Sequence, residues 1–328
     1  MMQNQTAPYT AQKIPLLVIA GPTASGKTGL SLELAERFGG EIVSADSMQI
    51  YKRMTIGTAK PTPEEMQGIP HHLIDFLEPG ESFSVAEYVA LAREVIADIA
   101  GRHRLPILVG GTGLYISSLL DNITFAETGS SAVIREHYKE LAEREGKEAV
   151  WRRLMAVDPE TAAGLHPNNI GRVIRALELY ELTGIPISRH KELSRQQPSP
   201  YEAVCIALDY RSRQTLYDRI DRRVDQMVEA GLVEEARELI ASGYSATAAQ
   251  AIGYKELLPY LEGTMPLGDC LDRIKMQSRR YAKRQLTWFR RDPRYRWFFP
   301  DDYPDAAVLT KNIVDYIEKS PLLCYTKG

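Results

Sequence analysis

The sequence IPLLVIAGPTASGKTGL, residues 14–30, joins an apolar run to a glycine-rich turn. The run has the length of a β-strand, and helical periodicity begins near Thr28. Between them, residues 21–28 fit the pattern GxxxxGK[ST], in which glycines let backbone N–H groups close around phosphate oxygens. Because a strand precedes the motif and a helix follows it, we interpret it as a phosphate-binding loop (P-loop).

The predicted P-loop is suited to a di- or triphosphate. The ammonium group of Lys27 supplies a positive charge, and the start of the following helix adds a partial positive charge. The hydroxyl of Thr28 is the expected protein ligand for Mg²⁺, which is the cofactor that we expect. The predicted diphosphate contacts in the loop are Gly21, Pro22, Thr23, Ala24, Ser25, Gly26, Lys27 and Thr28.

Further apolar runs extend the P-loop strand into a sheet. Strand character is found in residues 41–45 (EIVSA), 107–109 (ILV) and 202–210 (EAVCIALDY), and helical segments separate these runs. One of those helices has a capping box, with Ser84 followed three residues later by Glu87. Because odd and even positions of 202–210 are both apolar, we expect this strand to be buried on both faces, in the same parallel sheet.

The middle of the chain has a different sequence pattern. Residues 132–195 show helical periodicity and many charges, without a convincing strand. We therefore expect an α/β fold with a P-loop parallel-sheet core covered by helices and with a helical insertion domain. The expected division is a first part of the core at 1–120, a helical insertion at 121–200, and at 201–328 a return to the core followed by a basic helical part.

Composition restricts the class of protein. The 328 residues are 44% hydrophobic and 25% charged, which excludes a disordered chain and a disulfide scaffold. No apolar run reaches the roughly 18 residues of a membrane span, and the polar start lacks the apolar core of a signal peptide. Three scattered cysteines favour a reducing compartment, so we expect a cytoplasmic protein, acting as a monomer and without a membrane partner.

One polar residue expected of a nucleotide hydrolase is missing. The run at 107–109 ends in Gly110-Gly111-Thr112, whereas such enzymes usually have an acidic residue there for Mg²⁺ and water. The acidic residue after a strand is instead Asp46. Ligands of open α/β sheets bind at the carboxyl ends of strands, so Asp46 should face the phosphate site. The alternative interpretation of Asp46 is a helix cap or turn residue.

Five motifs resemble those of the bacterial tRNA dimethylallyltransferases. They are GPTASGKT (21–28), DSMQIYKRMTIGTAKP (46–61), VGGTGLY (109–115), AIGYKEL (251–257) and YAKRQLTWFR (281–290). Their order and spacing agree with the family from about residue 15 to residue 299. The zinc-finger extension that eukaryotic members tend to carry is absent from the sequence.

The resemblance implies a reaction and its partners. A dimethylallyl group would move from dimethylallyl diphosphate to the exocyclic amine of the adenine next to the anticodon in the tRNA anticodon stem-loop, and diphosphate would leave. It implies that Asp46 is the general base and that Thr112 lies near the transfer site. Ser47, Met48 and Gln49 are implied to hold the target base.

Arginines on a predicted helix at 216–228 are candidates for the diphosphate. Arg219 and Arg223 share a face four residues apart, and guanidinium groups bind phosphate oxygens in pairs. The alternative is a solvated face with helical partners Asp218 and Asp221. The resemblance favours the functional interpretation, with Arg219 among the catalytic residues and Arg223 as a diphosphate contact.

Residues 272–296 form a basic segment with ten lysines and arginines against two aspartates. The net charge of −3 is thus the sum of a segment of +8 and an acidic remainder. Such a segment is typical of binding to RNA phosphates, and aromatic side chains can stack on unpaired bases. A core role is the alternative for Trp288 and Phe289. The predicted tRNA contacts in the carboxy-terminal part are Gly253, Tyr254, Lys255, Lys283, Arg284, Gln285, Trp288 and Arg290.

The insertion contributes three more predicted tRNA contacts. Arg172 and Arg175 lie on one flank of a helix that Asn168 or Asn169 can cap, and Arg135 is a similar residue. Ordinary surface charge is the alternative for all three.

Two other functions share part of this pattern. A small-molecule or nucleotide kinase would have the same P-loop core, but the missing acidic strand end and the basic segment count against it. A non-catalytic RNA-binding protein with a P-loop would not need Asp46 in its intact motif.

Overall fold

The computed structural model describes residues 13–123, 125, 131–194, 197–245, 247–320 and 322 of the chain. These residues form two compact units. The core unit contains residues up to 120 and from 200 onward, and the insertion unit contains residues 121–199. Each unit has its own buried hydrophobic cluster.

The core unit is built on one parallel sheet of six strands in the order β3-β2-β4-β1-β5-β6. Its strands are β1 (Ile14–Ala20), β2 (Gly40–Ser44), β3 (His71–His72), β4 (Leu105–Gly110), β5 (Tyr201–Leu208) and β6 (Tyr295–Phe298). β5 pairs with the whole length of β1, although the insertion separates β5 from the earlier strands. This confirms the expectation that the run at 202–210 belongs to the same sheet.

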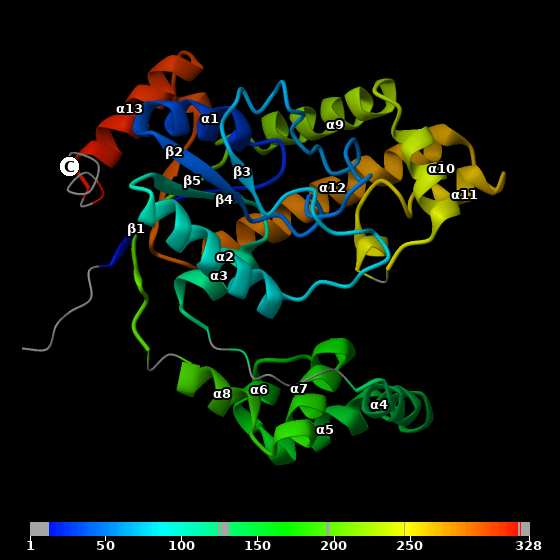
Figure 1. The fold of residues 1–328 in the computed structure, drawn as a ribbon. Coiled ribbons are helices and arrows are strands. Elements are labelled where there is room, and N and C mark those ends of the chain that lie inside the picture. The colour runs from blue at the N-terminus through cyan, green and yellow to red at the C-terminus, as the bar shows by residue number, and fades with distance from the viewer. Residues whose placement is uncertain are drawn as a thin grey trace, which may run out of the picture. The chain divides into compact units, whose positions relative to one another are not determined.

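Helices cover both faces of the sheet (Figure 1). One face carries α1 (Lys27–Phe38) and α13 (Ala306–Glu318), and the other carries α2 (Val85–Gly101) and α3 (Gly113–Leu120). Ser84 and Glu87 form the predicted capping box at the start of α2. The fold is therefore the expected P-loop α/β core, in which near-continuous apolar strands are shielded on both sides.

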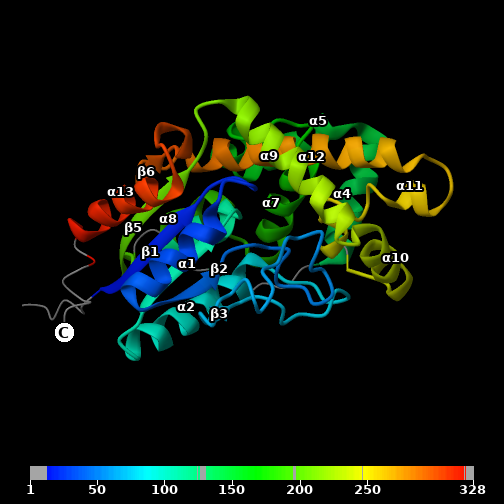
Figure 2. The ribbon, with the colours of Figure 1, turned by 90° about the horizontal axis from the view of Figure 1, so that it is seen from above.

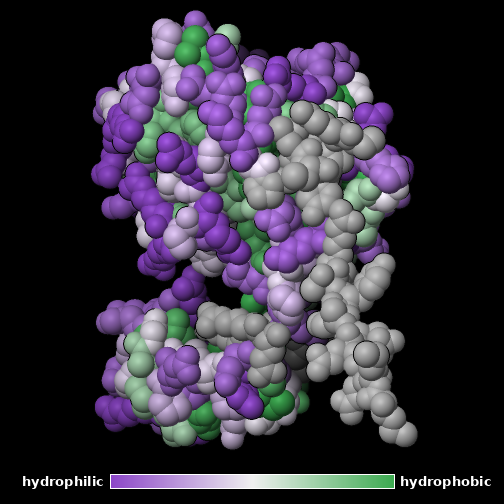
Figure 3. Space-filling view, turned by 90° about the vertical axis from the view of Figure 1, so that its left-hand side faces the viewer, coloured by the Kyte–Doolittle hydropathy of each residue, from purple (hydrophilic) through white to green (hydrophobic). Residues whose placement is uncertain are grey.

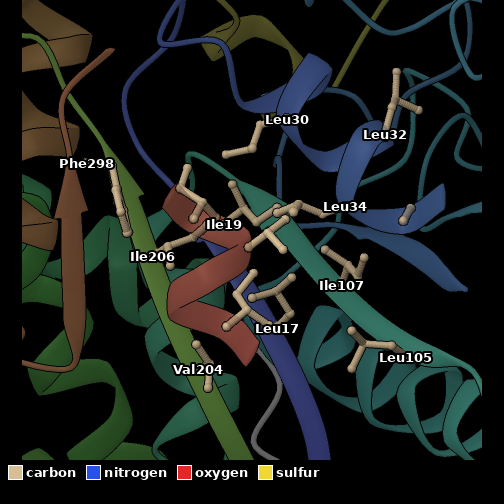
Figure 4. Packing of buried hydrophobic residues seen from close by; sticks show 14 of the residues in the cluster. Leu17, Ile19, Leu30, Leu32, Leu34, Leu105, Ile107, Val204, Ile206 and Phe298 are labelled. Atoms are coloured by element: carbon tan, nitrogen blue, oxygen red, sulfur yellow. The ribbon is translucent and has the colours of Figure 1, made fainter. Parts of the chain in front are cut away.

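The hydrophobic core lies between the sheet and the helices α1 and α13 (Figure 4). Leu17 and Ile19 of β1 and Ile206 of β5 point to this face, where leucines of α1 meet them. The intervening residues of β1, Leu16 and Val18, are equally buried. Successive side chains of β1 point to opposite faces of the sheet, and both faces are covered by apolar residues. This explains why β1 has no polar side chain.

A second layer of helices follows β5. Figures 1 and 2 show α9 (Arg213–Glu229) and the long α12 (Leu267–Phe289) side by side. The remaining helices of this part are α10 (Leu232–Ser242) and α11 (Leu258–Leu261), with single 3₁₀ turns at Ala248–Gln250 and Pro300–Asp302. Gly231, with a φ of 104°, separates α9 from α10.

All regular secondary structure in the described residues of the insertion unit is helical. Its helices are α4 (Ala132–Glu145), α5 (Lys147–Val157), α6 (Pro159–Ala163), α7 (Ile170–Thr183) and α8 (Ile187–Ser194). Val173, Ile174 and Leu177 of α7 enter the buried cluster of this unit. Asn169 occupies the cap position of α7, but its side chain makes no capping hydrogen bond, contrary to our expectation.

The exposed surface is mostly hydrophilic on the face shown in Figure 3. Only a few large apolar side chains are exposed among the described residues, and they are Leu114, Val133, Leu182, Leu193 and Trp288. None of the described helices combines the length and hydropathy needed to cross a lipid bilayer.

Candidate active site

The P-loop connects β1 to α1 in a strained conformation that depends on small residues. Gly21 has a φ of 150°, and a side chain there would collide with the carbonyl of Leu208 in β5. Gly26 at the start of α1 has a φ of 94°, and Ala24 has a φ of 61°. Such left-handed positions favour glycine. The turn leaves the backbone N–H groups at the start of α1 free of helical partners, which is the arrangement that binds phosphate.

A cavity of about 1160 Å³ opens beside the P-loop within the core unit. Its wall includes Asp46 and Gln49 after β2, and the loop at 55–62. Residues of α9, α12 and the segment 250–255 complete it. The cavity thus brings together, from separate parts of the chain, most of the residues predicted to hold the diphosphate and the target base.

Lys27 and Arg223 supply positive charge to this cavity. Burial, together with the nearby charge of Arg223, lowers the pKa of the Lys27 ammonium to about 7. Burial also lowers the pKa of Arg223, while the charge of Asp46 opposes this shift. Two cations held close enough to disfavour each other are stabilised when an anion binds between them. The cavity is therefore prepared for a negatively charged group.

Arg219 contacts the P-loop itself. Its Nε donates a hydrogen bond to the carbonyl of Ala24 at 2.9 Å, and its guanidinium lies over the ring of Tyr210. The two arginines therefore differ in their surroundings, because Arg219 binds the loop backbone whereas Arg223 is the more deeply buried cation.

Asp46 begins the turn that follows β2. Its Oδ1 accepts hydrogen bonds from the backbone N–H groups of Met48 at 2.9 Å and Gln49 at 3.3 Å. The turn interpretation of Asp46 is thus correct for one carboxylate oxygen. Oδ2 accepts no hydrogen bond from the described residues, and it is the oxygen available to take a proton.

Thr112 lies next to this turn because β4 is the neighbour of β2 in the sheet. Its hydroxyl accepts a hydrogen bond from the N–H of Ser47 at 3.0 Å and donates one to the Ser47 hydroxyl at 3.3 Å. A side chain at Gly110 would collide with the carbonyl of Ala45, so only glycine permits this approach. The structure therefore brings Thr112 to the Asp46 turn.

The basic segment is less free than its charge suggests. Four of its cations form ion pairs, most of them with acids from elsewhere in the chain: Lys275–Asp225, Arg279–Asp221, Arg290–Asp209 and Arg294–Asp292. Lys283 and Arg284 are exposed on α12. Phe289 is buried, whereas the Trp288 side chain, 38% exposed, packs over Gly113.

Gln285 and Tyr254 are buried, so we interpret them as supports and not as direct tRNA contacts. Gln285 accepts a hydrogen bond from the Thr23 N–H at 2.9 Å and donates one to the carbonyl of Gly111 at 3.0 Å. The Tyr254 hydroxyl donates to Glu235 at 2.7 Å. Gly253 and Lys255, on either side of Tyr254, line the cavity.

Removing the Gln285 amide should destabilise the core unit. Gln285→Ala leaves a P-loop N–H and a buried carbonyl without partners, so we expect the free energy of unfolding to fall by about 1–3 kcal/mol. Urea denaturation followed by circular dichroism would measure this. Lys283→Ala, on the exposed side of the same helix, is the control and should change the value by less than about 0.5 kcal/mol. Equal stabilities of the two variants would contradict the role of Gln285 as a support for the P-loop.

The arginines of the insertion unit fall into two groups. Arg135 and Arg175 both pair with the fully buried carboxylate of Glu178, at 2.9 and 2.7 Å. They still expose 43% and 45% of their side chains, so phosphate contact and ion pairing are compatible. Arg172 is exposed on α7, the helix that also carries Arg175.

Sequence reasoning missed three residues of this region. Tyr281 of α12 lines the cavity, and burial raises the pKa of its hydroxyl. The buried Lys60 ammonium bonds to the carbonyl of Tyr51 and the carboxylate of Asp75. Glu235 binds the loop at 55–57 from α10. Tyr281 and Lys60 lie inside two of the motifs that resemble the family, so those motifs could have indicated them. Glu235 lies in none of the motifs, and no local sequence pattern predicts its role.

The family model and the similar sequences all point to the same family. A family model described as IPP transferase matches residues 49–292. A tRNA dimethylallyltransferase of Thermoanaerobacter sp. (strain X514) is 51% identical over 93% of this chain and 98% of the relative. A tRNA dimethylallyltransferase of Bacillus subtilis (strain 168) is 49% identical over 93% of this chain and 97% of the relative.

Solved structures show the same likeness. The tRNA isopentenylpyrophosphate transferase of Bacillus halodurans has a TM-score of 0.71 and 46% identity, covering 96% of this chain and 99% of that chain. A eukaryotic dimethylallyltransferase described as acting on tRNA has a TM-score of 0.76 and 31% identity, covering 94% and 80% respectively. With a P-loop α/β core, a cavity that joins Lys27 to Asp46, and these matches along nearly its whole length, the chain belongs to the IPP transferase family, that of the tRNA dimethylallyltransferases.

Proposed function

We propose that this enzyme transfers a dimethylallyl group from dimethylallyl diphosphate to the exocyclic amine of the adenine 3′ of the tRNA anticodon. A bond forms between the adenine nitrogen and C1 of the dimethylallyl group, and the bond from C1 to the diphosphate oxygen breaks. Diphosphate leaves with the electron pair of that bond. The proton of the amine passes to Asp46. The observation that carries the proposal is one cavity that contains both a cation pair for the leaving group and a carboxylate for the nucleophile.

The cationic side of the cavity serves the leaving group. Negative charge grows on the diphosphate as the C–O bond breaks, and charges already in place stabilise it without reorganisation. Lys27 and Arg223 supply those charges, and Arg219 keeps the P-loop backbone in position. The remaining P-loop residues offer backbone N–H groups at the start of α1.

The Asp46 side of the cavity serves the nucleophile. The lone pair of the adenine amine is delocalised into the ring, so a base that removes its proton as the new bond forms assists the attack. Thr112 and Ser47 fix the turn that carries Asp46. Ser47, Met48 and Gln49 line the cavity beside it and form the surface proposed to hold the flipped base.

A magnesium ion fits the donor groups of the P-loop. The side chain of Thr28 is exposed at the start of α1, and it would be the protein ligand of the ion. Among the described residues no group of three or more His, Cys, Asp or Glu side chains could hold a metal, which agrees with an ion bound mainly by substrate oxygens and water. When bound, Mg²⁺ neutralises charge on the diphosphate.

RNA contacts are proposed on each of the two units, taken separately. Lys283, Arg284, Arg290 and the exposed part of Trp288 are the contacts on α12, and Arg135, Arg172 and Arg175 are those on the insertion. A tRNA substrate and a low content of cysteine fit a cytoplasmic enzyme.

Transfer of labelled dimethylallyl diphosphate to unmodified tRNA tests the proposal. We expect labelled tRNA to form with Mg²⁺ and without ATP, and we expect AMP to be a much poorer acceptor. A chain that consumes ATP and phosphorylates a small molecule would be the kinase alternative. A chain that binds tRNA without transfer would be the non-catalytic alternative.

A further inference from the structure

The loop at residues 55–59 connects two parts of the core unit that the proposed reaction does not otherwise join. On one side it contacts Glu235 of α10. On the other side it contacts Gln49, which is in the same turn as Asp46, the proposed general base. Its residues line the cavity. The contacts on each side are specific enough to define what the loop does.

Glu235 holds the first half of the loop. Its Oε2 accepts hydrogen bonds from the N–H groups of Thr55 and Ile56 at 2.9 and 2.8 Å, and its Oε1 accepts one from Gly57 at 2.9 Å. The Tyr254 hydroxyl donates to Oε1 at 2.7 Å. A side chain at Gly57 would collide with the Tyr254 ring, so glycine is needed there. Four donors bind one carboxylate, and these hydrogen bonds together hold the loop backbone in one conformation.

The second half of the loop holds Gln49. The carbonyls of Thr58 and Ala59 accept hydrogen bonds from Nε2 of Gln49, at 3.2 and 3.1 Å. An amide group has one end that donates and one that accepts, and two carbonyls can be satisfied only by the donating end. This neighbourhood therefore fixes the orientation of the amide. Nε2 is used within the protein, and Oε1 is the atom left for a ligand.

We propose that Glu235 is a positioning residue that keeps Gln49 as a hydrogen-bond acceptor and thereby favours adenine over guanine. Adenine carries an N6 amine that donates, whereas guanine carries an O6 carbonyl that accepts. An acceptor facing that position attracts the amine and repels the carbonyl. A Gln49 amide free to rotate would present its NH₂ group to guanine equally well. The inference rests on the proposed adenine substrate.

The test measures binding, so that it is independent of transfer. Anticodon stem-loops with adenine or guanine at the target position are titrated against the intact enzyme, and the ratio of the two Kd values is the readout. In Glu235→Gln, one accepting oxygen becomes a donor that faces backbone N–H groups. We expect the preference for adenine to fall roughly tenfold, the effect of one misplaced hydrogen-bonding group. The KM for dimethylallyl diphosphate should stay within about twofold, because the P-loop is not touched.

Two more variants separate positioning from loss of structure. Tyr254→Phe removes only the hydroxyl and should lower the preference in the same direction by a smaller factor. Glu238→Gln, on the exposed side of α10, is the matched control and should leave the ratio unchanged. If Glu235→Gln fails to fold, Tyr254→Phe carries the test, and an unchanged ratio there overturns the proposal.

A double-mutant cycle shows whether Glu235 acts through Gln49. Gln49→Ala should itself abolish most of the preference, and adding Glu235→Gln should then have no further effect on the ratio. An unchanged ratio in Glu235→Gln overturns the proposal, even if urea denaturation shows lower stability. Independent effects of the two substitutions would overturn it as well. A wild-type enzyme that binds both stem-loops but transfers no label would refute the proposed function instead.

Discussion

Replacing Asp46 by asparagine is expected to lower kcat for transfer to tRNA by about 10²–10⁴-fold, the usual contribution of a general base. The substitution is well matched to the site. The asparagine Oδ1 can still accept the hydrogen bonds from Met48 and Gln49, so the turn is kept while the proton acceptor is lost. Single-turnover transfer of labelled dimethylallyl groups measures the chemical step directly.

The KM for dimethylallyl diphosphate provides the control for this prediction. Because Lys27 and the P-loop backbone are unchanged, KM should move by less than about threefold in Asp46→Asn. A rate equal to that of the unmodified enzyme would contradict the role of Asp46 as the base. A large rise in KM with an unchanged rate would instead assign Asp46 to substrate binding.

Replacing Lys27 by methionine is expected to lower kcat/KM for dimethylallyl diphosphate by about 10²–10³-fold, the effect of removing a preorganised charge at the leaving group. Methionine keeps much of the length of the lysine stem, so the change is chiefly one of charge. Steady-state kinetics at saturating tRNA measure it. Lys283→Ala supplies the contrasting case, because it should weaken tRNA binding and leave the diphosphate KM unchanged. If Lys27→Met and Lys283→Ala changed the kinetics with dimethylallyl diphosphate and with tRNA equally, the assignment of Lys27 to the diphosphate would be wrong.

The lowered pKa of Lys27 predicts a pH dependence of diphosphate binding. In the free enzyme burial and Arg223 bring this pKa to about 7, so the charged form is lost as pH rises through that value. The bound diphosphate favours the charged form and raises the pKa. Affinity should therefore be greatest below about pH 7 and should fall as the pH rises to 8 and beyond. Calorimetric titration with diphosphate in Mg²⁺-free buffer would measure it, and Lys27→Met should remove this slope.

Much of the fold follows from local pattern. The apolar runs at 14–20 and 202–210 have the length and composition of buried strands, and the P-loop needs glycines at fixed spacing. Two strands could not be predicted. β3 has two residues and β6 has four, which is too short for a period to be recognised, and both form because the sheet offers them an edge.

The candidate site divides in the same way. Lys27, Asp46 and Thr112 stand at the ends of predicted strands or in a motif, where chain direction alone places them at one edge of the sheet. Gln285 and Tyr254 looked like RNA contacts because they lie in motifs beside basic residues. Their burial depends on Gly111 and Gly57, which are distant in the sequence.

The sequence alone determined the P-loop α/β core, the helical character of residues 132–194 and the position of Asp46 after a strand, because these depend on residues near one another along the chain. Only the tertiary structure decided which charges are free. Asp209, Asp221 and Asp225 neutralise cations of the basic segment, and Glu235 reaches a loop about 180 residues away. Ion pairs and hydrogen bonds act over a few ångströms of space, and the fold alone sets which residues come that close.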